Sequence, residues 1–122
     1  MEASMRFVFA TALFLAASSA SASSTMCMFY APPGAPVPDL EFLGYDQLGG
    51  ILVPGNGGPR SLPAGSYKVA KLDQHARRID LVYTNPDDPT LPPSFTLKGS
   101  AANTVLTVRG KTYRGKLECG QW

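Results

Sequence analysis

Apolar and polar side chains alternate along the stretch from Ser94 to Cys119, and this alternation predicts a three-stranded antiparallel meander. The runs are rich in β-branched and aromatic residues, and each is too short and too regularly alternating for an amphipathic helix. Turn residues separate them. The expected strands are Ser94–Lys98, Asn103–Arg109 and Thr112–Cys119.

The turns set the expected register of this meander. Glycine in the first place of the pair Gly110-Lys111 favours a type II′ hairpin turn, and residues 99–102 form the connection of the other hairpin. Both turns then place apolar residues on one inner face, and a slip by one residue would turn them to water. The expected pairs are Arg109 with Thr112, Val108 with Tyr113, Leu106 with Gly115, Lys98 with Asn103, Leu97 with Thr104 and Phe95 with Leu106.

Five earlier segments have the same character and are expected to form short strands. Between them lie connections rich in glycine and proline: residues 31–38 are expected to be extended and polyproline-like, and residues 54–63 to form a flexible loop. The pattern predicts an all-β domain, a small antiparallel barrel or sandwich of about seven short strands. The five segments are Met26–Tyr30, Asp39–Tyr45, Ile51–Val53, Ser66–Leu72 and Arg77–Thr84.

The chain begins with a segment typical of a cleaved signal peptide. An apolar run from Phe7 to Ala17 follows Arg6, and the small residues after it end in an A-x-A pattern at Ala22. The run is too short for a membrane-spanning helix, which needs roughly 20 apolar residues. The expected organisation is therefore a signal peptide over residues 1–22 and a single secreted or periplasmic β-domain over residues 23–122, with translation starting at Met1 or Met5.

Export makes the cysteine count informative. The chain has two cysteines, Cys27 and Cys119, and two cysteines in an oxidising compartment are expected to pair. The bond would join the first strand to the last and close a loop of roughly 90 residues, which stabilises the folded state by about 4 to 5 kcal/mol in the chain-entropy view. The alternative is a pair of free thiols, with Cys119 buried on the inner face.

Charge and side-chain chemistry then narrow the classes of function. A formal net charge of +2 is too small to indicate a nucleic-acid or anionic-membrane ligand. The only histidine, His75, is expected in a polar turn beside Asp73, and no serine has the sequence context of a catalytic nucleophile. The acidic residues lack the spacing of a calcium loop. We therefore expect no catalytic residue, no metal and no cofactor.

Basic side chains mark the face of the meander that points to solvent. Lys98, Arg109, Arg114 and Lys116 fall on this outer face, with Glu118 as its only acid. One interpretation is a docking surface for an acidic partner. The other is a solvated face whose charges protect the sheet from edge-to-edge association.

These observations favour a binding module of bacterial type that recognises another protein in the envelope or outside the cell, for example an inhibitor or immunity protein against a wall-degrading enzyme. Its contacts are expected in the loops Asp46 to Leu62 and Asn85 to Pro93, with Tyr45 and Tyr113 as aromatic anchors. The alternatives are a carrier that holds a small ligand in the barrel interior and a structural protein of the envelope. The candidate contact residues are Tyr45, Asp46, Arg60, Asp87, Asp88, Arg109, Arg114 and Lys116.

The general layout, a small exported barrel with a disulfide near its ends, resembles that of periplasmic lysozyme inhibitors. The resemblance implies a protein-binding role. It does not extend to the Ser-Gly-x-x-Tyr inhibitory motif of that family, which this sequence lacks.

Overall fold

A computed structural model of the protein describes residues 24–55 and 57–120, so the expected signal peptide lies outside the described residues. The described part contains nine strands and one short 3-10 turn, η2. No helix in this part of the chain is long and apolar enough to cross a membrane. The elements are β1 Ser24–Tyr30, β2 Leu40–Gly44, β3 Leu48–Val53, β4 Arg60–Ser61, β5 Tyr67–Asp73, β6 Arg78–Tyr83, β7 Phe95–Ser100, η2 Ala101–Asn103, β8 Thr104–Val108 and β9 Lys111–Cys119.

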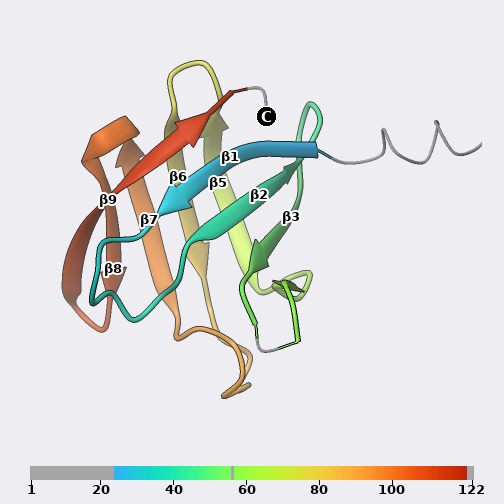
Figure 1. Ribbon diagram of the computed structural model, residues 1–122, viewed down its shortest axis with the longest axis vertical. Coiled ribbons are helices and arrows are strands. Elements are labelled where there is room, and N and C mark those ends of the chain that lie inside the picture. The colour runs from blue at the N-terminus through green and yellow to red at the C-terminus, as the bar shows by residue number, and fades with distance from the viewer. Residues whose placement is uncertain (1–23, 56, 121–122) are drawn as a thin grey trace, which may run out of the picture.

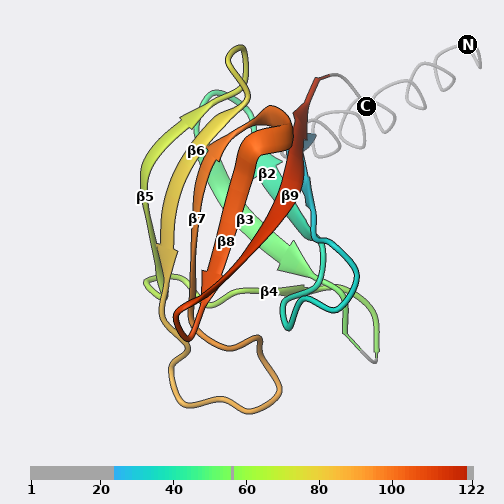
Figure 2. The same cartoon turned by 90° about the vertical axis from the view of Figure 1, so that its left-hand side faces the viewer.

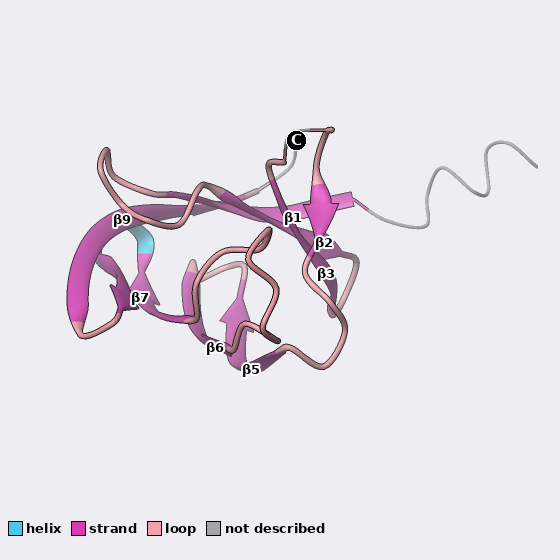
Figure 3. Cartoon of the chain, turned by 90° about the horizontal axis from the view of Figure 1, so that it is seen from below, coloured by secondary structure: helices cyan, strands magenta, loops and turns pink. Residues whose placement is uncertain are grey.

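All nine strands belong to one antiparallel sheet in the order β4-β3-β2-β1-β9-β8-β7-β6-β5. It consists of two meanders, β1 to β4 and β5 to β9, which are joined where β1 pairs with β9. The sheet curls into a half-barrel (Figures 1 and 3). The predicted all-β class and antiparallel arrangement are thus confirmed.

Most strand boundaries differ from the prediction by one or two residues, and two segments differ more. β3 begins at Leu48 and includes Gly49 and Gly50. Leu48 faces Gly44 of β2 and Gly50 faces Leu43, so Gly49 lies between two paired residues. The segment expected to be a flexible loop contains β4, whose Arg60 and Ser61 face Val53 and Leu52. Glycine and proline reduce the strand propensity of these segments, but pairing with a neighbouring strand overrides it.

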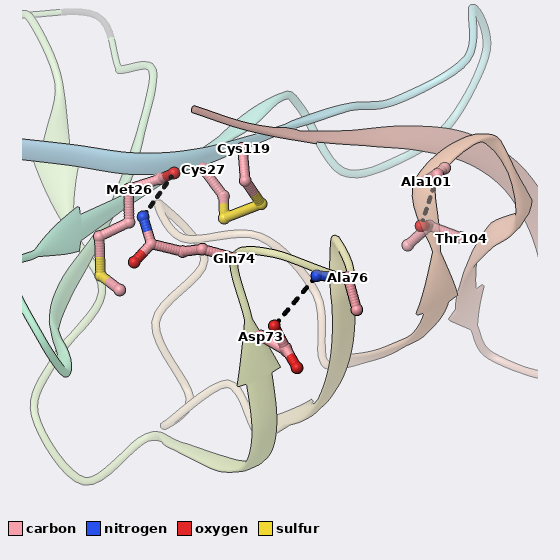
Figure 4. Close-up of a disulfide and its surroundings, with 8 residues drawn as sticks. All are labelled: Met26, Cys27, Asp73, Gln74, Ala76, Ala101, Thr104 and Cys119. Carbon is pink, nitrogen blue, oxygen red and sulfur yellow. Dashed lines mark hydrogen bonds between the residues drawn. A yellow bond between two sulfur atoms is a disulfide. The ribbon is translucent and has the colours of Figure 1, made fainter. Parts of the chain in front are cut away.

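The predicted disulfide is confirmed. Cys27 and Cys119 face each other across the β1–β9 pair and are bonded, at a sequence separation of 92. Figure 4 shows the bond beneath the two strands, with the side chain of Gln74 beside it. The Gln74 Nε2 donates a hydrogen bond to the carbonyl of Met26 at 3.4 Å, so the β5–β6 turn is held against β1 next to the disulfide.

The core fills the concave side of the sheet. Alternating residues of β2, β6 and β7 point inward and are buried, as predicted for β6 and β7, whereas the inner side chains of β5 are only partly buried. Val37, Leu62 and Leu91 come from loops and close one end of the core. The largest fully buried side chains are Tyr83, Phe29, Phe42, Leu40, Ile51, Ile79, Leu81, Leu97, Leu106, Leu117, Val37 and Val108.

The predicted registers of the last meander are wrong by two residues. In the structure Leu106 faces Tyr113 rather than Gly115, and Leu97 faces Leu106 rather than Thr104. A shift by an even number of residues keeps every side chain on its own face, so the predicted inner face is still correct.

Local turn geometry explains the first shift. Arg109 and Gly110 both have positive φ angles, 50° and 79°, which is the pattern of a type I′ turn over these two residues rather than a type II′ turn over Gly110-Lys111. Arg109 therefore lies in the turn and does not face Thr112.

The other shift arises at η2. Lys98 faces Val105 rather than Asn103, so the connection between the paired residues of β7 and β8 is two residues longer than expected and contains η2. β7 itself continues to Ser100, which pairs with Arg78 of β6. The hydroxyl of Thr104 donates to the carbonyl of Ala101 at 2.8 Å and closes this turn (Figure 4).

The proline-rich segment after β1 is a hairpin connection rather than an extended crossing. Its chain reverses at a turn in which the N–H of Ala35 donates to the carbonyl of Pro32 at 3.2 Å. Gly34 occupies the third position with a φ of 86°, as a type II turn requires. The turn allows β2 to lie beside β1.

Gly115 is needed where β9 changes neighbours. Before this residue β9 pairs with β8, and after it with β1. A Cβ atom at Gly115 would lie 2.5 Å from both the Phe29 ring and the Tyr30 carbonyl oxygen, so only glycine fits between them. The aromatic ring of β1 thus packs directly on the backbone of β9.

The disulfide should contribute strongly to stability. Replacing both cysteines (Cys27→Ala with Cys119→Ala) should lower the free energy of unfolding by about 4 kcal/mol, because the unfolded chain regains the entropy of an open loop. Urea unfolding followed by far-ultraviolet circular dichroism measures this difference, and reduction of the unmodified protein should reproduce it. A loss below about 1 kcal/mol would show that the β1–β9 pairing does not need the bond.

Candidate functional site

The connections of the half-barrel differ between its two ends. At one end, which we call the loop end, lie loops 31–39 and 84–94, the described residues on either side of β4 and the turn at residues 109–110 (Figures 1 and 2). The opposite end has the short turns 45–47 and 74–77, η2 and the disulfide. Long connections on a rigid sheet are where binding contacts are usually found, which directs attention to the loop end.

Asn85 organises loop 84–94 of this end through its side chain. Its Oδ1 accepts a hydrogen bond from the N–H of Asp88 at 2.7 Å, and its Nδ2 donates to the carbonyls of Asp88 and Pro92 at 2.9 and 2.8 Å. A longer bond of 3.4 Å reaches the Leu91 carbonyl. The backbone N–H of Asn85 donates to the Ser94 hydroxyl at 2.8 Å. One side chain thus ties both halves of the loop together.

The same loop is fixed to the core. The Tyr83 hydroxyl donates to the Pro92 carbonyl at 3.1 Å, and the Leu91 side chain is 6% exposed. The ring of Tyr83 packs against that of Phe95, with centroids 4.9 Å apart. Burial, and after it the nearby Asp88 carboxylate, raises the pKa of Tyr83, so this tyrosine stays a neutral donor.

Asp88 is held by its own loop and by β4. Its Oδ1 accepts hydrogen bonds from the hydroxyl and the N–H of Thr90 at 2.6 and 2.9 Å. The Arg60 guanidinium lies 3.8 Å from Asp88 Oδ2 and donates to the Thr90 hydroxyl at 2.5 Å. The hydrogen bonds from Thr90, followed by the charge of Arg60, hold the pKa of Asp88 below its ordinary value.

A pocket of about 480 Å³ lies beside this loop, with Asp87 and Arg109 on its walls. Both residues are exposed, and both have left-handed backbones, with φ angles of 67° and 50°. In the described part of the chain no ion pair joins them. The opposite charges therefore remain available at the surface.

The structure brings together four of the predicted contact residues. Arg60, Asp87, Asp88 and Arg109 all lie at the loop end.

The other four are elsewhere. Tyr45, which is 70% exposed, and Asp46 lie in the β2–β3 turn at the opposite end, whereas Arg114 and Lys116 lie on the outer face of β9. Lys116 is paired with Glu118 at 2.7 Å. The predicted residues therefore do not form a single surface.

The polar turn around His75 has a structural explanation. The Oδ1 of Asp73 accepts a hydrogen bond from the N–H of Ala76 at 3.0 Å, which closes the β5–β6 turn (Figure 4). This hydrogen bond is the main reason that the pKa of Asp73 is lowered. Over residues 24–55 and 57–120, no group of three or more His, Cys, Asp or Glu side chains could hold a metal ion.

Comparison with protein-family models, with curated proteins and with solved structures finds no significant match to this chain. The resemblance in layout to lysozyme inhibitors is therefore not accompanied by a family assignment. The geometry of the loop end has to carry the functional argument.

Sequence reasoning did not identify Asn85, Thr90 or Ser94 as members of this site. Asn85 precedes a proline and stands three residues before Asp88, a pattern in which an asparagine side chain caps a turn. That signal was present in the sequence. Arg60 and Thr90 are 30 residues apart in the sequence. No local sequence pattern therefore indicated that Arg60 contacts this loop.

The substitution Thr90→Val should raise the pKa of Asp88, because it removes the hydroxyl donor and leaves the backbone donor in place. A titration of the Asp88 carboxyl carbon by NMR measures the change. A carboxylate with a lowered folded-state pKa stabilises the fold above its ordinary pKa, so the variant should lose stability only above about pH 4.

Thr96→Val, on the exposed face of β7, is the matched control and should leave the titration of Asp88 unchanged. An identical Asp88 titration in Thr90→Val and in the unmodified protein would contradict the assigned cause.

Proposed function

We propose that the protein is an exported, non-catalytic binding module that recognises a protein partner through its loop end. The observation that carries this proposal is the construction of loop 84–94, whose backbone is fixed in advance by Asn85, Ser94 and Tyr83. A loop that is ordered before binding loses little conformational entropy in the complex, and this favours affinity.

The charge pattern of the loop end supports a polar and specific contact. Asp87, Pro89 and Thr90 project at the surface, and Arg109 stands across a pocket from Asp87. Exposed charges of both signs on a rigid frame can match the charge pattern of one partner protein. They weaken the binding of proteins that place like charges opposite them. The disulfide supports an extracytoplasmic location, since such bonds persist in oxidising compartments.

The packing of the interior favours this function over that of a small-ligand carrier. Leu97, Leu106 and Phe42 occupy the centre of the half-barrel and have no exposed surface. A ligand would have to displace side chains that pack at the density of a protein core. The interior therefore supports the loops rather than offering a binding site.

An enzyme that degrades the cell wall is the partner class that we favour. A protruding, preformed loop can enter an active-site cleft, and glycosidase clefts of this kind contain paired carboxylates. Arg109, which forms no ion pair among the described residues, would supply positive charge opposite such carboxylates. The protein would then act as an inhibitor or immunity protein.

The test is capture and affinity measurement with a loop variant. The oxidised protein should capture one protein at 1:1 stoichiometry from an envelope extract of its source, and the captured protein should degrade peptidoglycan less rapidly in the complex. Asn85→Ala removes the hydrogen bonds that fix the loop and should weaken this binding at least tenfold, measured by calorimetry.

Asn103→Ala is the matched control, because Asn103 is exposed in η2 at the opposite end. This variant should bind as well as the unmodified protein. Failure of the oxidised protein to capture any partner, or equal affinities of the two variants, would contradict the proposal. Far-ultraviolet circular dichroism confirms that both variants are folded.

A further inference from the structure

A second concave surface lies beside the loop end, on the outer face of β1, β2 and β3. It is a pocket of about 410 Å³, a volume within the usual range of ligand sites. Its floor is formed by Met28 and Leu52 and its rim by Asp39 and Glu41. One wall is formed by Val53, Pro54, Gly55, Gly58 and Pro59. None of these residues belongs to the cluster around Asn85.

The floor of the pocket is apolar although it faces away from the core. In the sheet register Met28 faces Glu41, and Glu41 faces Leu52, so the three side chains form one row across three strands. Met28 and Leu52 are half-buried, whereas their strand neighbours Phe29 and Val53 point into the core. The row thus offers apolar surface on both sides of one carboxylate.

The wall of the pocket connects it with the loop end. The N–H of Gly58 donates to the carbonyl of Gly55 at 3.1 Å and closes a tight turn. A Cβ atom at Gly55 would lie 2.9 Å from the Gly58 carbonyl oxygen and 3.3 Å from Cγ of Arg60. Because Arg60 also contacts Asp88 and Thr90, it links this wall of the pocket to loop 84–94.

Both carboxylates of the rim are oriented by one hydrogen bond each. Asp39 Oδ1 accepts from the N–H of Ala31 at 2.9 Å, and Glu41 Oε2 accepts from the Thr25 hydroxyl at 2.5 Å. Among residues 24–55 and 57–120, neither carboxylate has a lysine or arginine within 4.0 Å, and the second oxygen of each accepts no further hydrogen bond. The pocket therefore presents fixed negative charge next to apolar surface.

We propose that this pocket receives a lysine or arginine side chain of the partner protein. The aliphatic stem of such a side chain would cover Met28 and Leu52, and its cationic head would lie between Asp39 and Glu41. Long basic side chains bury their stems and keep their charged heads at a polar rim, which matches this arrangement. The inference rests on the proposed function and names the chemistry that the partner must present.

The apolar floor sets this site apart from a metal site. A divalent cation with oxygen ligands needs several carboxylates, carbonyls or waters around it, and a floor of Met28 and Leu52 supplies none of these.

A second copy of the chain is a different possible occupant of the pocket. A lysine on the outer face of that copy would then provide the cationic head.

The first measurement uses blocked amino acids as probes. The purified oxidised protein carries 13C-methyl methionine, and the Met28 signal is assigned with Met28→Leu. N-acetyl-lysine methylamide and the arginine analogue should shift the Met28 signal saturably, whereas N-acetyl-norleucine methylamide, which has a similar stem without the charge, should not. The signal of Met26, which is buried in the core, should stay unchanged with every probe.

Charge variants supply the second measurement. Glu41→Gln keeps an acceptor for the Thr25 hydroxyl, so it removes the charge with little structural change. Together with Asp39→Asn it should abolish the Met28 shift and weaken binding of the captured partner at least tenfold. Asp46→Asn removes one charge in the turn at the other end and should change neither quantity.

Four results would overturn the inference. An equal shift with the norleucine probe would show an apolar site without charge selectivity. A Met28 shift that grows with protein concentration in the absence of probe would identify a second copy as the occupant. A partner affinity that is unchanged in the double variant but reduced by Asn85→Ala would remove the pocket from the interface and leave the proposed function intact, whereas an affinity reduced by neither would count against both.

Discussion

The pairing of β1 with β9 is the constraint on which the rest of the molecule depends. Each of the two meanders is built from neighbouring segments of the chain, and only this pair joins them into one sheet. The Cys27–Cys119 bond fixes the pair covalently, and the Phe29 ring on Gly115 fixes it by packing. A domain of this size buries a modest core, so one covalent link between its first and last strands contributes a large share of its stability.

The half-barrel that this pairing completes has two ends with different properties. The disulfide end has tight turns that are satisfied internally, as in the bond from Ala76 to Asp73. The loop end has long proline-rich connections, and the buried side chains of Val37, Leu62 and Leu91 anchor them in the core. The hydrogen bond from Tyr83 to Pro92 adds a further anchor for loop 84–94. The sheet therefore acts as a frame that presents a preformed loop and an adjoining acid-rimmed pocket.

Much of the fold could be predicted from the sequence, because alternation of apolar and polar residues determines which side chains face inward, as in Ile79, Leu81 and Tyr83. The strand registers could not be predicted, because a shift by two residues preserves this alternation. In addition, the left-handed backbone conformation of Arg109, which sets the turn, has no strong sequence signal. The site was predicted only in part. Arg60 and Asp88 were both candidates, but their contact depends on the folding of β4 beside a distant loop, which no local pattern reports.

The proposed function requires a loop end that is ordered before it binds its partner. Amide hydrogen exchange of the oxidised protein, alone and in complex with its captured partner, tests this requirement. We expect slow exchange of the Asp88 N–H already in the free protein, because Asn85 accepts its hydrogen bond, and new protection confined to residues 54–61, 85–94 and 109–110. Rapid exchange of the free loop, or new protection in the turn at residues 45–47, would contradict it.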